Sequence, residues 1–267
     1  MSSHVPPQPA APRDEIGPAH RRRSEASGPA RPPAALRDPA SHLRLWSVVV
    51  FGLAVDLWTK QWAFQTLRQG GHRALIPGVL ELRTTLNPGA LFGIGAGRTE
   101  VFLIASVLAL VLVVWMFAQC PRQRWLTHIA LGAILAGALG NMYDRAFVDL
   151  VAYPLQTPNA ALVRYYVPED SPDGQWVLLR EYPPTAEQTP RRVPCAVAER
   201  LSPPVGYVRD FIKIPTCWFG DRELWPWVFN VADMLLVAGV VILALRLLHD
   251  RKSQTDTGSE PRTAVSG

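Results

Sequence analysis

The most constraining feature of this sequence is the apolar run at residues 225–248, which reads WPWVFNVADMLLVAGVVILALRLL. About 20 such residues are enough to cross a lipid bilayer as a helix. The run nevertheless contains an acid, Asp233, close to its start. A carboxylate near the hydrocarbon core costs about 2.5–3.5 kcal/mol, and ionisable groups placed there usually serve a function. A second acid, Asp210, lies just upstream in GYVRDFIKIP, so these two acids are candidates for a catalytic pair.

Three more apolar runs occupy residues 43–64, 100–118 and 125–143. We therefore expect a mainly α membrane protein with four transmembrane helices. The net charge of +5 comes from Arg and Lys placed beside the apolar runs, which suits membrane orientation better than nucleic-acid binding. Both termini and the short loop that holds Arg122 and Arg124 are expected to be cytoplasmic by the positive-inside rule.

The polar segments between and around these runs differ in character. Residues 1–42, rich in Pro, Ala, Arg and Ser, and residues 250–267 are expected to be disordered cytoplasmic tails. The first thirty residues lack the apolar stretch of a cleavable signal peptide. Apolar residues alternate with polar ones near Leu80 and Leu82, so residues 65–99 are predicted to form a small extracytoplasmic β platform or a connecting hairpin. Residues 146–208 are predicted to be an outward-facing insertion, either a small β-rich subdomain or a partly ordered loop.

This topology brings the charged residues of the spans to one end. Asp56 and Lys60 lie four positions apart near the end of the first span, in the favourable order for a helical ion pair, which could also be a purely structural pair holding helices together. The third span ends in the polar cluster NMYDR, residues 141–145, which is denser than interfacial capping needs. Both groups, with Asp210 and Asp233, are expected at the outer membrane face.

Two carboxylates close together and partly out of water cannot both ionise easily, so one becomes an acid while the other stays a base. That arrangement activates water without a metal, a cofactor or a covalent intermediate. The six histidines are scattered and no HExxH occurs, which argues against a metal site. The sequence contains no GxSxG motif, which argues against a serine nucleophile. The residues thus favour aspartic protease chemistry.

These residues resemble the lipoprotein signal peptidase family, the bacterial signal peptidase II enzymes. Five segments carry the resemblance, in the family's order and across all four spans: VDLWTK, LNPGALFGI, GALGNMYDR, GYVRDFI and FNVADM. The resemblance implies an inner-membrane aspartic endopeptidase at residues 43–249. Such an enzyme removes the signal peptide of a prolipoprotein on the N-terminal side of its diacylglyceryl cysteine, in contact with membrane lipids.

The resemblance also implies roles for individual residues. Asp210 and Asp233 match the catalytic dyad of the family. Residues expected around the substrate or the dyad are Asn87, Gly89, Asn141, Arg145 and Asn230. Residues expected to give structural support are Asp56, Lys60 and Asp144.

The insertion is the main departure from the family pattern, and it creates a second candidate acid, Asp149. We prefer Asp210, because residues 206–211 reproduce the whole pattern G-x-V-x-D-F directly before the last span, whereas Asp149 has no matching glycine. The insertion could be a lid, a partner-binding module or neutral, and Cys195 could pair with Cys217. Two other functions use similar residues: a proton-coupled carrier with intramembrane carboxylates, and an assembly protein with an outward domain.

Overall fold

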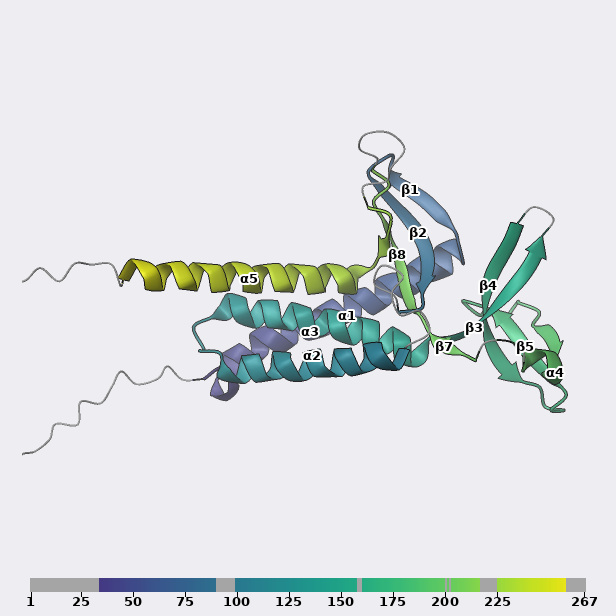
Figure 1. Ribbon diagram of the computed structural model, residues 1–267, viewed down its shortest axis with the longest axis horizontal. Coiled ribbons are helices and arrows are strands. Elements are labelled where there is room, and N and C mark those ends of the chain that lie inside the picture. The colour runs from purple at the N-terminus through teal and green to yellow at the C-terminus, as the bar shows by residue number, and fades with distance from the viewer. Residues whose placement is uncertain are drawn as a thin grey trace, which may run out of the picture. The chain divides into compact units, whose positions relative to one another are not determined.

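The computed structural model describes residues 34–89, 99–157, 160–199, 201, 203–216 and 225–257. Four long helices dominate these residues and run alongside one another (Figure 1). They are α1 (Pro39–Leu67), α2 (Thr99–Gln119), α3 (Trp125–Phe147) and α5 (Val231–Thr257). A 3-10 turn, η1 (Ala35–Arg37), precedes them, and a one-turn helix, α4 (Cys195–Ala198), lies between α3 and α5.

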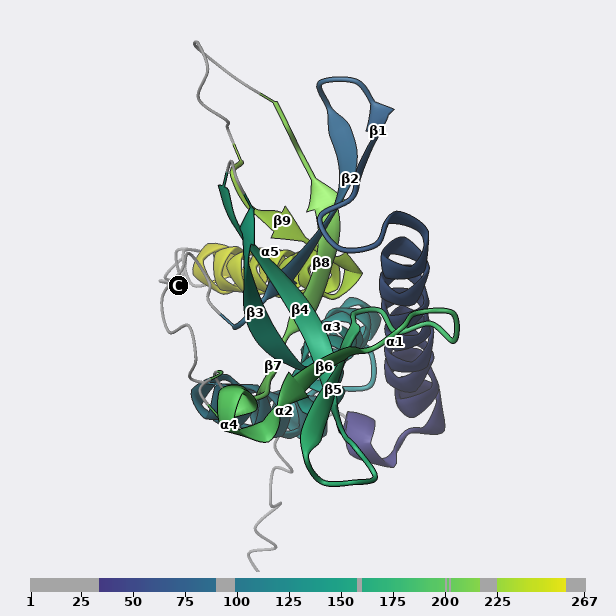
Figure 2. The ribbon, with the colours of Figure 1, turned by 90° about the vertical axis from the view of Figure 1, so that its right-hand side faces the viewer.

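The strands form two antiparallel sheets, seen in front of the helices in Figure 2. The first sheet has the order β1-β2-β8-β9, with strands His72–Ile76, Leu80–Asn87, Val208–Lys213 and Val228–Phe229. The second sheet has the order β6-β5-β4-β3-β7, with strands Arg191–Pro194, Trp176–Glu181, Ala160–Asp170, Asp149–Thr157 and Val205–Gly206. The insertion is therefore a β subdomain.

The helices have the apolar surfaces of a membrane protein. Among the described residues, α1, α3 and the part of α5 up to Arg251 are long and apolar enough to cross a bilayer, and α2 contributes a shorter apolar stretch, Ser106–Gln119. Phe51 on α1 is 73 % exposed, and Val237 on α5 is 63 % exposed. Such large apolar side chains on a helix surface suit contact with lipid rather than water.

Helix α3 is the centre of the helical part, since it packs against α1, α2 and α5. Small residues permit this packing, as they do between membrane helices. A Cβ atom on Gly137 would lie 2.3 Å from the carbonyl oxygen of Ala232, the residue next to Asp233. The absence of a side chain at position 137 therefore sets how closely α5 approaches α3.

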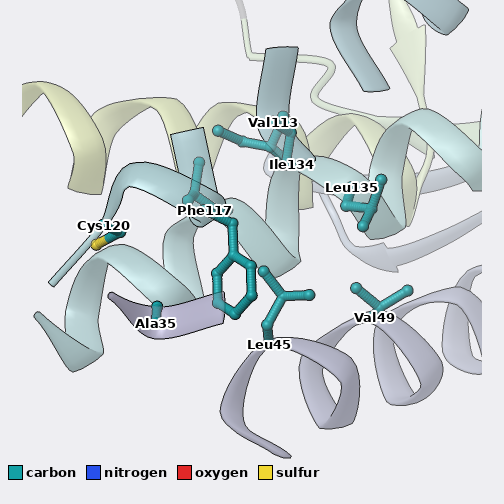
Figure 3. Close-up of a cluster of buried hydrophobic side chains, with 9 residues drawn as sticks. Ala35, Leu45, Val49, Val113, Phe117, Cys120, Ile134 and Leu135 are labelled. Atoms are coloured by element: carbon teal, nitrogen blue, oxygen red, sulfur yellow. The ribbon is translucent and has the colours of Figure 1, made fainter. Parts of the chain in front are cut away.

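A cluster of buried apolar side chains joins the first half of α1, the second half of α2 and the first half of α3 (Figure 3). Its members are Ala35, Leu45, Val49, Val113, Phe117, Cys120, Leu131, Ile134 and Leu135. Phe117 stands at its centre, with its ring edge-on to both His42 and His128 at centroid distances of 5.1 and 5.4 Å. The cluster connects η1 to α1, α2 and α3.

The structured part of the chain is longer at both ends than we expected. The sequence predicts a disordered tail over residues 1–42, but Ala35 is buried and its N–H donates to the carbonyl of Cys120 over 2.7 Å. Asp38 caps α1 through the N–H of Ser41 at 2.9 Å, with Pro39 at the first helical position. The second tail was expected from residue 250, yet α5 continues to Thr257, because a helix that has formed is extended easily by polar residues.

The last helix begins later than its apolar run, at Val231 rather than at residue 225. The preceding Val228 and Phe229 form β9 and pair with β8. Among its described residues, the expected platform of residues 65–99 supplies β1 and β2, and the sheet is completed by β8 and β9 from beyond the insertion. The alternation of apolar and polar residues near Leu80 predicts a strand there, but it does not show that β8, far along the chain, pairs with that strand.

Candidate active site

Asp210 enters the site from the middle of β8. This strand pairs with β2, where Thr85 lies directly opposite Asp210. The Nδ2 atom of Asn87, at the end of β2, donates to Oδ2 of Asp210 over 3.0 Å. Asn230 donates through Nδ2 to the other oxygen over 2.6 Å. The carboxyl group of Asp210 is thus buried between two amide donors.

Asp233 and Asn230 form the cap of α5. The N–H of Asp233 donates to Oδ1 of Asn230 over 3.0 Å, and the N–H of Asn230 donates to Oδ2 of Asp233 over 3.2 Å. This reciprocal arrangement is a capping box, in which an N-cap side chain and an acid three residues later satisfy each other's backbone donors. The positive end of the helix dipole stabilises an anion at this place.

Asn141, on α3, completes the connection between the two acids. Its Nδ2 donates to Oδ1 of Asp233 over 2.8 Å. Its Oδ1 accepts from Nδ2 of Asn230 over 3.1 Å and from Nζ of Lys60, also over 3.1 Å. Because both donors meet the oxygen, the amide can offer only its NH₂ group to Asp233.

A second group of charges lies behind these amides, entirely buried between α1, α3 and β8. Lys60 Nζ lies 2.8 Å from Asp56 and 3.3 Å from Asp144. Asp56 in turn accepts from the N–H of Ala232 over 2.8 Å. Arg209, the residue before Asp210, donates to Asp144 through Nε over 3.0 Å and through Nη2 over 2.6 Å. The buried charges are thus paired, as the cost of burying them requires.

The environment of Asp210 favours its protonated form. Burial raises the pKa of this carboxyl group, and the nearby charge of Asp233 raises it further, to about 8. The amides of Asn87 and Asn230 act in the opposite direction but are outweighed. Asp210 therefore keeps its proton at neutral pH, beside a second acid held at a helix N-terminus.

The expected site residues fall into one connected group, with two at its edge. Arg145 donates through Nη1 to the carbonyl of Asn141 at 3.4 Å. Gly89 has a φ of 102°, and its N–H donates to Oδ1 of Asn87 over 3.1 Å, which orients that amide. Asp149 instead lies exposed on β3 opposite Gly206, outside this group.

Some residues of the site were not expected from the sequence. Arg209 and its partner Gln61 were missed, because a charge in a strand gives no sign of its burial. The capping box was missed although N-x-x-D at the start of a helix is a recognised signal. Within the described residues, no group of three or more His, Cys, Asp or Glu could hold a metal ion. Cys217, the candidate partner of Cys195, lies outside the described residues.

Comparisons with known proteins match most of this chain to one family. The sequence profile of the family described as Signal peptidase (SPase) II matches residues 48–249. A lipoprotein signal peptidase of Clostridium novyi (strain NT) is 33 % identical over 206 residues, covering 77 % of this chain and 97 % of that protein. The corresponding protein of Rhodopirellula baltica is 37 % identical over 215 residues, covering 78 % and 73 %. That of Desulfitobacterium hafniense (strain DSM 10664 / DCB-2) is 27 % identical over 211 residues, covering 79 % and 97 %.

The family match extends from α1 to α5 and includes every residue of the connected polar group. The apolar helices, the paired acids and this match all point to one class of protein. The chain belongs to the signal peptidase II family of aspartic-type membrane proteases.

Proposed function

We propose that this protein removes the signal peptide of prolipoproteins, cutting on the N-terminal side of a diacylglyceryl-modified cysteine. The observation that carries the proposal is the position of Asn230, which hydrogen-bonds to Asp210 through its side chain and to Asp233 through its backbone. One residue thereby holds two acids from different elements in a fixed relation. Relatives that are named lipoprotein signal peptidases support the choice of substrate.

In the proposed reaction, Asp233 is the base and Asp210 is the acid. Asp233 takes a proton from water, and the hydroxide attacks the scissile carbonyl carbon. Asp210 gives its proton to the carbonyl oxygen, which produces a neutral gem-diol. One diol hydroxyl then returns a proton to Asp210 as the carbonyl re-forms and the C–N bond breaks. Asp233 gives its proton to the leaving amine of the modified cysteine, so both acids return to their starting states.

The division of roles follows from the surroundings of each acid. A group that donates to the substrate must hold its proton at neutral pH, and Asp210 does so because its pKa is raised to about 8. A base must accept a proton, and Asp233 already accepts hydrogen bonds from the N–H of Asn230 and from Nδ2 of Asn141. Two acids with environments this different suit opposite proton-transfer roles.

The proposed setting is the bacterial cytoplasmic membrane. All four long helices would span it, with both chain ends and the loop that carries Arg122 and Arg124 in the cytoplasm. The acids lie at the opposite end of α3 from that loop, so the site would face outward. The substrate's acyl chains would remain in the bilayer, against exposed apolar residues such as Val237. The peptidase domain would comprise residues 43–249, with the β subdomain facing outward.

The test is cleavage of a diacylglyceryl-modified prolipoprotein by the purified protein in lipid, followed by gel shift. We expect Asp210→Asn and Asp233→Asn to lower the rate at least about 100-fold, because each removes one proton-transfer role. Asp149→Asn is the matched control and should cleave normally. Cleavage retained in Asp210→Asn, or lost in Asp149→Asn, would show that the dyad has been assigned to the wrong acid.

A further inference from the structure

A cavity of about 310 Å³ lies between β2 of the first sheet and β4 of the β subdomain. The β2 residues in its wall include Thr85, which lies directly opposite Asp210 in the sheet. They also include Leu86, the neighbour of Asn87, whose amide binds Asp210. The cavity thus reaches to within one residue of a group that contacts the candidate dyad. Its volume is at the lower end of the range for ligand sites, which suits a short segment of chain rather than a folded partner.

The edge of β2 at this cavity has no strand beside it within the described part of the chain. There, β1 pairs with β2 only as far as Arg83. On the other edge of β2, Leu86 lies opposite Arg209, whose N–H donates to Asp144 over 2.9 Å. Leu86 and Arg209 therefore form one of the non-hydrogen-bonded pairs that alternate along antiparallel strands. The N–H and C=O groups of Leu86 consequently point away from β8, to the edge that lines the cavity.

The facing edge of β4 is open in the same way. Its pairing with β5 begins at Tyr166, so Val163 has no described strand on that side. On the other side Val163 lies opposite Pro154 of β3, which has no N–H to give. The carbonyl of Tyr165 accepts from the N–H of Tyr182 over 3.0 Å, so the backbone groups of Tyr165 point away from β3. Two residues earlier in the same strand, those of Val163 point the same way, and Val163 lines the cavity.

The loop after α1 already joins these two edges at one end of the cavity. The N–H of Thr84 in β2 donates to the carbonyl of Gly71 over 3.0 Å. Gln69 binds β4, because its Oε1 accepts from the N–H of Tyr165 over 3.0 Å and its Nε2 donates to the carbonyl of Tyr165 over 2.6 Å. The loop thus takes the place of a strand between β2 and β4. Two residues further along each strand, that place is the cavity.

We propose that this cavity receives the first residues of the mature polypeptide, directly after the modified cysteine, as a strand between β2 and β4. Strand addition binds a peptide through its main chain, so the site would accept mature chains of different sequence. Arg83 and Arg164 also line the cavity, and Arg83 is exposed. Charged walls suit a chain that leaves the membrane rather than an acyl chain or an apolar signal peptide. The β subdomain then supplies one side of a substrate subsite.

Synthetic diacylglyceryl-modified peptides, cleaved by the full-length protein in lipid, test this proposal, which rests on the function proposed above. One peptide ends at the cysteine and the other continues beyond the cavity. We expect the longer peptide to have a KM about tenfold lower at similar kcat, because binding away from the reacting bond stabilises the ground state and the transition state equally.

Methylation of single backbone nitrogens tests the pairing itself. Each methyl group in the first mature residues removes one N–H donor and should raise KM about three- to tenfold. Neighbouring positions should respond alike, because successive N–H groups of a strand point to opposite sides and would meet β2 and β4 in turn. The same methylation far from the cysteine is the matched control and should leave KM unchanged.

Val163→Pro tests the protein side of the contact. It removes the N–H at the open edge and keeps the pairing of β4 with β3, which does not use that N–H. The variant should lose most of the dependence of KM on the mature segment, and the methylated peptides give an independent test with the unmodified protein. A full dependence on the mature segment in Val163→Pro would overturn the contact with β4.

The remaining outcomes separate this proposal from the proposed function. Cleavage that depends on Asp210, with a KM indifferent to both length and methylation, would overturn this proposal alone. A KM that responds only to the length of the acyl chains would assign the cavity to lipid and overturn it too. An effect of methylation at alternate positions only would leave one edge in contact and overturn the strand between β2 and β4. Absence of cleavage of every peptide by the unmodified protein would overturn both proposals.

Discussion

Lys60 donates from Nζ to the side-chain oxygen of Asn141 over 3.1 Å, and Asn141 in turn donates to Asp233 over 2.8 Å. Lys60→Met should therefore both destabilise the protein and slow cleavage. Removing one partner of a buried ion pair costs about 3–5 kcal/mol, because the remaining charge is left without compensation. Thermal unfolding in detergent measures the first effect, and kcat measures the second.

The double variant Asp56→Asn/Lys60→Met is the matched control for that loss of stability, because it removes the anion together with the cation. It should recover a large part of the lost stability while the activity stays low. Equal stabilities of the single and double variants would mean that Asp56 and Lys60 are not energetically coupled.

The pKa of Asp210, raised to about 8, predicts the alkaline limb of the rate profile. As the pH rises through this value, Asp210 loses the proton that it gives to the carbonyl oxygen, so kcat should fall about tenfold per further pH unit. The Asn87 amide lowers the pKa of Asp210, so Asn87→Ala should move this limb to higher pH. If the alkaline limb of Asn87→Ala stays at the same pH, the Asn87 amide does not influence the pKa of Asp210.

Stability should depend on pH with the opposite sign to that of an ordinary salt-bridged acid. The pKa of Asp210 is about 8 in the folded protein against 3.8 for an unperturbed carboxyl, so the folded state binds more protons between these values. The contribution of Asp210 to the free energy of unfolding is fully present below about pH 4 and is lost as the pH rises towards about 8. Asp210→Asn, which cannot ionise, should be inactive yet lose less stability over this window. The two melting temperatures, compared at several pH values, test this expectation.

Gly137→Ala should separate α5 from α3, since the added Cβ would lie 2.3 Å from the carbonyl of Ala232. Overpacking of this kind costs about 1–3 kcal/mol, and here it also shifts Asp233 relative to Asn141. We expect a lower melting temperature and a lower kcat. Ala138→Ser, at the neighbouring half-buried position, is the control and should be close to neutral.

The helical part of the fold was largely predictable, because apolar runs report directly on helices in a membrane. The resemblance to the family favours Asp210 over Asp149, since only the residues around Asp210 reproduce the family pattern in full, and this choice stays a prediction. The start of α5 was predicted six residues too early, at residue 225 instead of Val231, because an apolar run does not show where a cap interrupts it. The domain limits and the roles of single residues remain predictions.

The polar partners could not be predicted in the same way. Arg209 looks like a solvent-exposed charge in VRDF, and only the folded chain brings it to Asp144, 65 positions earlier. The pairing of β8 with β2 likewise crosses the whole insertion. Composition and periodicity describe a residue's neighbours along the chain, whereas these contacts depend on its neighbours in space.

The paired base of the β subdomain has a consequence for the history of this chain. Residues 149 and 206 lie opposite each other on antiparallel strands, so their Cα atoms are only about 4.5–5.5 Å apart. A segment with adjoining ends can be gained or lost by one genetic event without displacing α3 or β8. By its connections the subdomain could be exchanged as a unit, and its other contacts are those that Tyr165, Tyr182 and Pro183 make with the end of α1 and the two residues after it.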